Sequence, residues 1–231
     1  MADALAAIVP PGVVVVERGW VAAREGPDAD GLPPLHPVEE ELIAGASQRR
    51  RREFAEARDC AREALRSLGA PAQAIPAGPD GAPVWPQGVV GSITHKGSYC
   101  AAAVARSAQL AGLGIDAEPD EPMPAGVLET VASPRELEQV EALLARRPGV
   151  AWDRLLFAAK EAALKAAHPF SAPQGVRGVE VELDAVAGSF TAVAGARLGV
   201  PAAPEIHGTW ATSHGRILAV ASVPPEAVGR A

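Results

Sequence analysis

An apolar strand that ends in two acids is predicted at Leu113-Gly114-Ile115-Asp116-Ala117-Glu118-Pro119. Positions i and i+2 of a strand point to the same face, so the carboxylates of Asp116 and Glu118 converge at the strand end. Two carboxylates that close together repel each other unless a cation lies between them. Oxygen ligands of this kind favour Mg2+ or Mn2+, although two solvated acids before a proline turn give the same pattern.

Strand and helix patterns lie on both sides of this stretch. Before it, strands are predicted at 13–16, 89–94 and 100–105, with a helical segment over 38–68 that Gly45 divides. After it, helices are predicted from Ser133 and over 152–167, followed by strands at 179–183, 190–193, 206–212 and 217–223. Stretches rich in Pro and Gly at 22–37 and 69–88 are predicted loops. The order indicates an α+β fold of two comparable halves, 1–108 and 109–231.

The composition narrows the functional class. The 28 acidic residues exceed the 21 Lys and Arg, giving a formal charge of −7, which argues against a nucleic-acid binder. Cys60 and Cys100 lack the spacing of a zinc site and are typical of a reducing compartment. The start of the chain lacks the basic region of a signal peptide and breaks at Pro10-Pro11, and no apolar run suffices for a membrane span. We therefore expect a cytoplasmic protein.

The predicted helix over 152–167 carries a charged face. Glu161 and Lys165 are four residues apart and share that face, and Lys160 precedes Glu161. A surface ion pair of about 0.3–0.5 kcal/mol accounts for this spacing by itself. The functional alternative makes Glu161 a third metal ligand and the two lysines partners of a phosphate.

Candidate anion-binding residues also occur upstream. The arginines of the run 49–52 and at 58, 62 and 66 lie in a helical segment, where pairing with nearby glutamates on a solvated helix is the simplest account. Arginine suits phosphate because its planar fork binds two oxygens at once. Thr94 and His95 end a predicted strand and supply further donors for a phosphate monoester.

The order of these motifs resembles one enzyme family. The matching stretches are Val84-Trp85-Pro86, Gly91 to His95, Gly114 to Pro119 and Phe157 to Lys165, together with the arginine-rich segment from 51 to 69. They resemble the surfactin-type 4'-phosphopantetheinyl transferases, in the bacterial branch that includes the enterobactin-synthetase component D-like and actinobacterial enzymes. The resemblance covers roughly residues 36–170 and is specific because three motifs occur in order.

The resemblance implies a monomeric enzyme with coenzyme A in the cleft between two similar α+β halves. Carried over by position, the Mg2+ ligands are Asp116, Glu118 and Glu161, with Asp116 also beside coenzyme A. The expected contacts of coenzyme A itself are Lys160 and Lys165 at the pyrophosphate, Thr94 and His95 at the 3'-phosphate, Arg50 and Arg58 around the nucleotide end, and Ala77–Asp80 near the adenine. The family pattern often has a basic residue at Ala77 and a bulky aromatic after Lys165, where this chain has Ala166-Ala167-His168.

The implied reaction moves 4'-phosphopantetheine from coenzyme A to a serine of an apo acyl, aryl or peptidyl carrier protein, releasing 3',5'-bisphosphoadenosine. Glu161 is the expected proton acceptor, directly or through water, and Lys165 the group that stabilises developing negative charge. Two other functions share parts of the pattern: a non-catalytic module that binds coenzyme A or a carrier, and a Mg2+-dependent phosphatase. Lys96, which follows His95, is a hypothetical substitute for the missing basic residue at Ala77.

Overall fold

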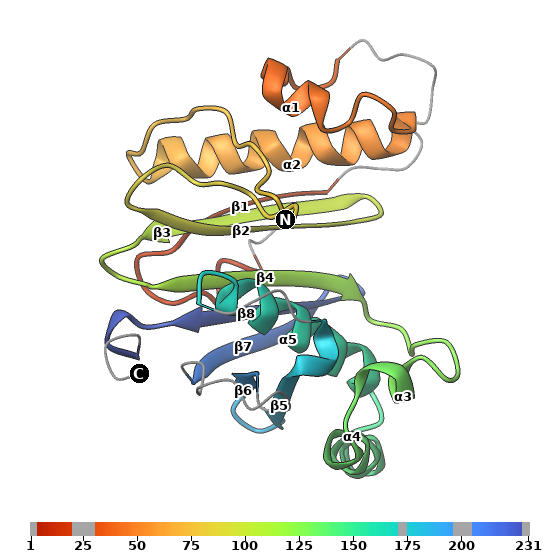
Figure 1. The fold of residues 1–231 in the computed structure, drawn as a ribbon. Coiled ribbons are helices and arrows are strands. Elements are labelled where there is room, and N and C mark those ends of the chain that lie inside the picture. Colours follow the sequence, from red (N-terminus) through yellow and green to blue (C-terminus); the bar gives the residue numbers. More distant parts are fainter. Residues whose placement is uncertain (1–3, 20–30, 171–174, 196–204, 228–231) are drawn as a thin grey trace.

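The computed structural model describes residues 4–19, 31–170, 175–195 and 205–227. Residues 22–30 of the loop predicted at 22–37 lie outside these ranges. The α+β prediction is confirmed, because helices pack on two separate antiparallel sheets (Figure 1). No helix in these ranges combines the length and the apolar character that a bilayer span requires.

The first sheet contains β1 (Val14–Gly19), β2 (Val89–Lys96) and β3 (Tyr99–Arg106), in the order β1-β3-β2. The short helix α1 (Pro37–Glu41) precedes the long helix α2 (Gln48–Ser67), so the predicted division near Gly45 falls between them. Ser47 caps α2 by accepting a hydrogen bond from the backbone N–H of Arg50 at 3.3 Å. Alanines and Leu65 of α2 pack on one face of β3, forming the core of this half.

The second sheet has five strands in the order β4-β8-β7-β6-β5. Their bounds are β4 (Gly112–Pro119), β5 (Val179–Asp184), β6 (Ser189–Ala194), β7 (Ile206–Ser213) and β8 (Arg216–Val223). Its helices are α3 (Leu128–Val131), α4 (Pro134–Arg146) and α5 (Trp152–Ala167), with 3-10 turns at Val176–Gly178 and Pro225–Ala227. The helix α5 lies across β4 and β8, and its apolar face fills the larger core.

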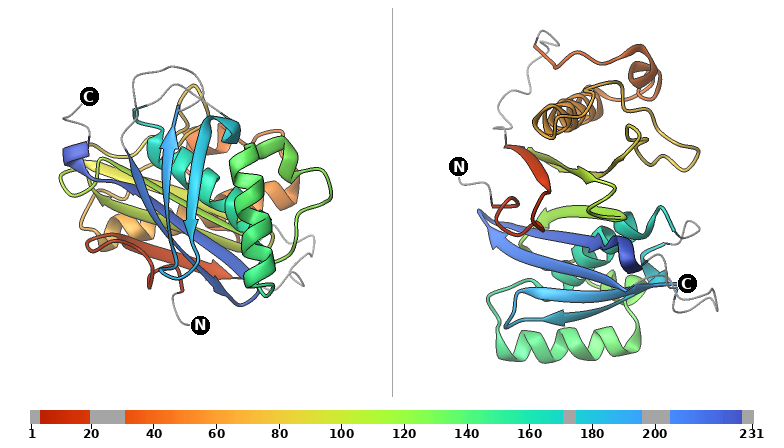
Figure 2. Two further views of the ribbon diagram at one scale, coloured as in Figure 1. Left: turned by 90° about the horizontal axis from the view of Figure 1, so that it is seen from below. Right: turned by 90° about the vertical axis from the view of Figure 1, so that its left-hand side faces the viewer.

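The two sheets lie one above the other, with a shared apolar layer between them (Figure 2). That layer contains alternate residues of β3 and β4, together with Leu5 from the start of the chain. The edge strands β2 and β4 run side by side without a ladder between them. Side chains join them instead, since the Ser92 hydroxyl accepts a hydrogen bond from the backbone N–H of Ile115 at 3.0 Å.

Glycines on β4 let α5 approach the strand closely. A Cβ atom at Gly114 would lie 1.9 Å from the carbonyl oxygen of Ala162, and one at Gly112 would lie 2.1 Å from that of Ala166. Asp116 and Glu118 continue the same face of β4 beyond these glycines. The close packing therefore places the charged residues of α5 beside the two acids.

We expect Gly114→Ala to destabilise the protein by roughly 3 kcal/mol, because backbone on both sides must move to admit the methyl group. Urea denaturation followed by circular dichroism measures this loss. Gly149→Ala is the matched control, since nothing lies within 4 Å of a Cβ atom there, and it should change stability by less than about 0.5 kcal/mol. Similar stabilities of the two variants would contradict the close approach of α5 and β4.

Candidate active site

The acids of β4 lie buried between the two halves. Asp116 is 6% exposed and Glu118 is 5% exposed, values that are unusual for ionised carboxylates. The Thr94 hydroxyl on β2 donates to Oδ1 of Asp116 at 3.3 Å, so the first half contributes directly to the environment of these acids. The structure thus brings Thr94, Asp116 and Glu118 together at the junction of β2 and β4.

Lys165 of α5 completes the surroundings of Asp116. Its ammonium group donates to Oδ1 of Asp116 at 2.7 Å and to the carbonyl oxygen of Ile115 at 2.9 Å. The other carboxylate oxygen, Oδ2, is buried and has no hydrogen-bond partner among the residues that the structure describes. A buried carboxylate oxygen without a donor is costly unless a cation occupies the space beside it, so this atom fits a divalent cation.

Glu118 is held by two basic side chains. Lys96 donates to Oε1 at 2.9 Å, and Arg154 donates to Oε2 at 3.3 Å. Lys96 therefore contacts an acid of β4. Sequence reasoning missed Arg154, although it lies seven residues before Glu161 on the same helix and so shares its face.

Glu161 lies in the electrostatic field of the other acids. Burial raises its pKa above the usual range, and the charges of Asp116 and Glu118 raise it further, while Lys165 lowers it. Among the described residues, no three acidic, histidine or cysteine side chains form a ready-made metal cluster. The lysines and Arg154 instead provide the positive charge around the carboxylates.

Lys160 points away from this group and corrects the expected contact with the pyrophosphate. Its side chain is fully buried, and its ammonium group donates to both carboxylate oxygens of Glu136 at 2.6 Å. Glu136 also accepts the backbone N–H groups of Ser133 and Val181. Successive helix residues are about 100° apart, so Lys160 cannot share the direction of Glu161. The Lys160–Glu136 pair joins α5, α4 and β5 inside the second half.

The candidate residues for the nucleotide end include a contact between α2 and β2. Nη1 of Arg50 lies 2.7 Å from Nε2 of His95, so an arginine donor requires this ring nitrogen to be unprotonated. Burial lowers the pKa of His95, and the charges of Arg50 and Lys165 lower it further. His95 is therefore neutral at pH 7 and accepts a hydrogen bond from Arg50.

The lowered pKa of His95 makes stability depend on pH. The unfolded state binds a proton near pH 6.5, whereas the folded state resists protonation, so stability is lost as the pH falls below about 6.5. We expect His95→Gln to lose less stability than the wild type between pH 7.5 and 5. Urea titrations at both pH values measure the difference, with His207→Gln on the exposed face of β7 as a control that should follow the wild type. Equal losses in wild type and His95→Gln would contradict the assignment.

Arg58 lies in a different environment from Arg50. It is 6% exposed, stacks 4.4 Å from the ring of Phe54 and lies near Glu39. The neighbouring Arg62 makes the closer contact with Glu39, at 2.9 Å. The structure therefore places Arg58 within a buried cluster of charges at the junction of α1 and α2.

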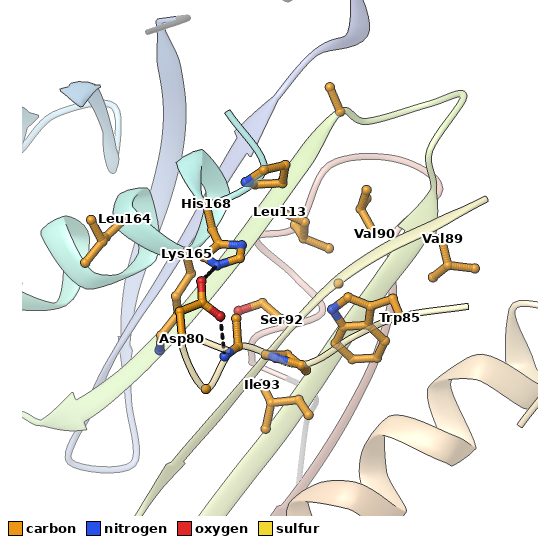
Figure 3. Close-up of a pocket in the computed structure, with 16 residues that line it drawn as sticks. Asp80, Trp85, Val89, Val90, Ser92, Ile93, Leu113, Leu164, Lys165 and His168 are labelled. Atoms are coloured by element: carbon orange, nitrogen blue, oxygen red, sulfur yellow. Dashed lines mark hydrogen bonds and ion pairs between the residues drawn. The ribbon is translucent and has the colours of Figure 1, made fainter. Parts of the chain in front are cut away.

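A cavity of about 600 Å³ opens beside Lys165 between the two halves (Figure 3). Trp85 and Leu113 give it an apolar wall, and Leu164 of α5 lies on the opposite side. Asp80 in the loop before β2 contacts His168 at the end of α5, which lowers the pKa of Asp80. The cavity can therefore hold part of a small molecule next to Lys165, whose ammonium group also contacts Asp116.

Comparisons with known proteins agree with this geometry. The family described as "4'-phosphopantetheinyl transferase N-terminal domain" matches residues 38–105, and the "4'-phosphopantetheinyl transferase superfamily" matches residues 112–202. The chain is 42% identical to 4'-phosphopantetheinyl transferase Svp of Streptomyces mobaraensis over 92% of this chain and 87% of that protein. It is 35% identical to 4'-phosphopantetheinyl transferase PptT of Mycobacterium tuberculosis, over 93% and 96%. A match to 4'-phosphopantetheinyl transferase Npt of Nocardia iowensis reaches 50% identity over 59% and 60%. The similarity along nearly the whole chain shows that this protein belongs to the 4'-phosphopantetheinyl transferase family.

Proposed function

We propose that this enzyme transfers the 4'-phosphopantetheine group of coenzyme A to a serine of an apo acyl, aryl or peptidyl carrier protein, releasing 3',5'-bisphosphoadenosine. The observation that carries the proposal is the junction of β2, β4 and α5, where the buried Asp116 meets Lys165 beside a cavity. The actinobacterial relatives support its placement in the surfactin-type bacterial branch.

The proposed metal is Mg2+, with Mn2+ as an alternative. Asp116, Glu118 and Glu161 would hold it, and the unpartnered Oδ2 of Asp116 supports a cation there. When bound, the ion would neutralise negative charge on the pyrophosphate of coenzyme A.

The proposed chemistry uses Glu161 and Lys165. Glu161 accepts the proton of the carrier serine, directly or through water. The serine oxygen forms a bond to the phosphorus of phosphopantetheine, and the bond from that phosphorus to the bisphosphoadenosine oxygen breaks. Lys165 stabilises the negative charge that develops during this transfer.

Binding of coenzyme A is divided between the two sides of the junction. The cavity lined by Trp85 and Leu113 receives the pantetheine arm, since it opens beside Lys165 and its volume suits a small-molecule substituent. Arg50 and His95, with Thr94 and Arg58, receive the phosphates of the nucleotide end, because they supply donors on the first half. Lys160 has no part in this assignment because its charge is paired internally with Glu136.

Several properties of the whole protein are also part of the proposal. The sheets change between the end of β3 at Arg106 and the start of β4 at Gly112, which supports domains of 1–108 and 109–231. The acidic composition supports the absence of nucleic-acid binding. A monomeric, cytoplasmic enzyme without membrane attachment fits a substrate that is a small carrier protein.

Incubation with coenzyme A, Mg2+ and a panel of apo carrier proteins tests the function, with intact mass as the readout. A mass increase of one phosphopantetheine group on a carrier is the expected result. Binding of coenzyme A without turnover on any carrier would instead favour a binding module, and release of inorganic phosphate without a carrier would favour a phosphatase.

A further inference from the structure

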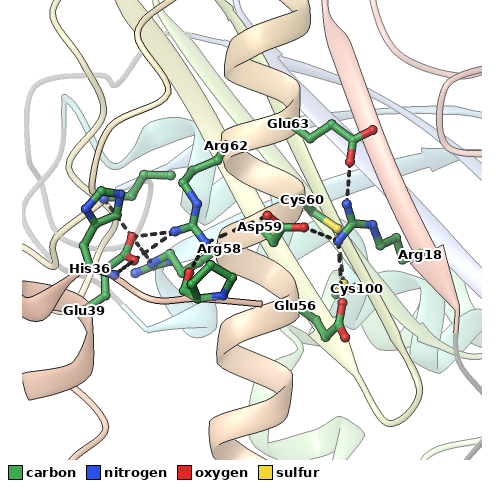
Figure 4. Close-up of polar contacts among 12 residues, drawn as sticks. Arg18, His36, Glu39, Glu56, Arg58, Asp59, Cys60, Arg62, Glu63 and Cys100 are labelled. Carbon is green, nitrogen blue, oxygen red and sulfur yellow. Dashed lines mark hydrogen bonds and ion pairs between the residues drawn. The ribbon is translucent and has the colours of Figure 1, made fainter. Parts of the chain in front are cut away.

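A buried carboxylate ties together three segments near the expected nucleotide end. Glu39 of α1 is fully buried and accepts the backbone N–H groups of His36 and Ile75, each at 2.9 Å (Figure 4). Nη1 of Arg62 donates to both oxygens of the carboxylate, at 2.9 and 3.2 Å. Glu39 therefore joins α1, α2 and the loop that leads to Ala77–Asp80.

Arg58 lies one turn before Arg62 and has unused hydrogen-bonding capacity. Within the described part of the chain, its buried Nε atom has no hydrogen-bond partner, and it lies 4.0 Å from Oε1 of Glu39, too far for a hydrogen bond. Burial lowers the pKa of Arg58 to about 10, and the nearby charges of Arg62 and Arg50 act in the same direction. Arg58 is therefore charged at pH 7, and its Nε donor is left without a hydrogen bond by the described residues.

The negative charge of Glu39 offsets the repulsion between Arg58 and the neighbouring arginines. The guanidinium groups of Arg50 and Arg62 both repel that of Arg58, and the carboxylate of Glu39 opposes this repulsion. Glu39 accepts hydrogen bonds from Arg62, whereas Nε of Arg58 lies too far from it to donate one. Without this negative charge, repulsion would displace Arg58 from α1 and from the neighbouring Arg50.

We propose that Glu39 is a positioning residue that holds Arg58 in place for the 3'-phosphate of coenzyme A, so that Glu39 determines how strongly the enzyme prefers coenzyme A over 3'-dephospho-coenzyme A. The inference rests on the proposed function. It assigns Glu39 no contact with the substrate, because Glu39 acts through Arg58.

Glu39→Gln tests this inference, since glutamine keeps the size and one acceptor oxygen but removes the charge. We expect KM for coenzyme A to rise about tenfold with kcat nearly unchanged, while KM for 3'-dephospho-coenzyme A stays close to its wild-type value. Any loosening at Ile75 affects both substrates and cancels in the ratio of their kcat/KM values. The readout is therefore that ratio, together with the melting temperature.

Glu136→Gln is the matched control, because Glu136 is also a fully buried carboxylate but lies in the second half. It should lower the melting temperature and leave the substrate ratio unchanged. An unchanged ratio in Glu39→Gln, or equal losses on both substrates, would overturn the inference and leave Glu39 with a structural role. Should Glu39→Gln fail to fold, Glu39→Asp carries the same test with an expected decrease in the ratio of about threefold.

Calorimetric binding of the two coenzymes to the wild type and to Glu39→Gln separates this inference from the proposed function. Wild-type protein that binds neither coenzyme refutes the function itself. Wild-type protein that prefers coenzyme A, alongside a Glu39→Gln variant with the same preference, refutes the positioning role alone.

Discussion

Asp116→Asn should reduce kcat by about 10³-fold or more, which corresponds to roughly 4 kcal/mol of transition-state stabilisation. Asparagine keeps the size of the side chain and can still accept the hydrogen bond from Thr94, which the wild-type residue accepts at 3.3 Å. It lacks the negative charge that pairs with Lys165 and that a divalent cation requires. The loss should therefore affect catalysis far more than folding.

Initial rates measured by intact mass, at several Mg2+ concentrations, test this prediction. The melting temperature of Asp116→Asn should stay within a few degrees of the wild type, because Lys165 is 30% exposed and can be hydrated once its partner is neutral. Glu182→Gln serves as the control and should leave the rate unchanged, since Glu182 of β5 forms an exposed pair with Arg135 of α4. An Asp116→Asn variant that retains more than a tenth of the wild-type rate would refute the proposed role of Asp116.

Lys160→Met should destabilise the protein by about 3–5 kcal/mol, because it leaves the charge of Glu136 buried without its partner. The ammonium group of Lys160 donates to both carboxylate oxygens of Glu136 at 2.6 Å, and both side chains are at most 1% exposed. Urea denaturation measures the loss. The double variant Lys160→Met/Glu136→Gln should recover part of the stability, since no charge remains buried and the glutamine oxygen still accepts a backbone N–H.

The same variants separate an internal ion pair from a contact with the pyrophosphate. Calorimetry should show that the double variant binds coenzyme A within about twofold of the wild-type affinity, because Lys160 lies away from the acids of β4. A tenfold or larger decrease in the affinity for coenzyme A would support the expectation that Lys160 contacts the pyrophosphate. A stability equal to that of the wild type in the single variant would refute the buried pair.

Local patterns predicted the elements of the fold well. The strand over Leu113–Glu118, the helix capped by Ser133 and the helix over 152–167 all appear in the structure as β4, α4 and α5. These predictions depend on periodicity, capping and breaking residues, which act within a few residues of the chain. The short helix α3 was not predicted, since its four residues carry too little periodic pattern.

Sequence spacing was a weaker guide to the direction of side chains on helices. Glu161 and Lys165 share a face through their four-residue spacing, and Arg154, two helical turns before Glu161, shares it too. Family resemblance drew attention to Lys160 instead. The structure turns Lys160 toward Glu136 and Arg154 toward Glu118. The glycines of β4 set how closely α5 approaches the two acids, and the sequence did not reveal this packing role.

The sequence by itself determined the order of strands and helices, the shared face of Asp116 and Glu118, and the motifs that identify the family. Only the tertiary structure decided which charges are paired: Lys165 with Asp116, Lys160 with Glu136 and Arg62 with Glu39. The physical reason is the distance along the chain over which each interaction acts. Helix and strand periodicity are local properties of the backbone, whereas a buried charge is paired with whatever group distant packing brings within about 3 Å of it.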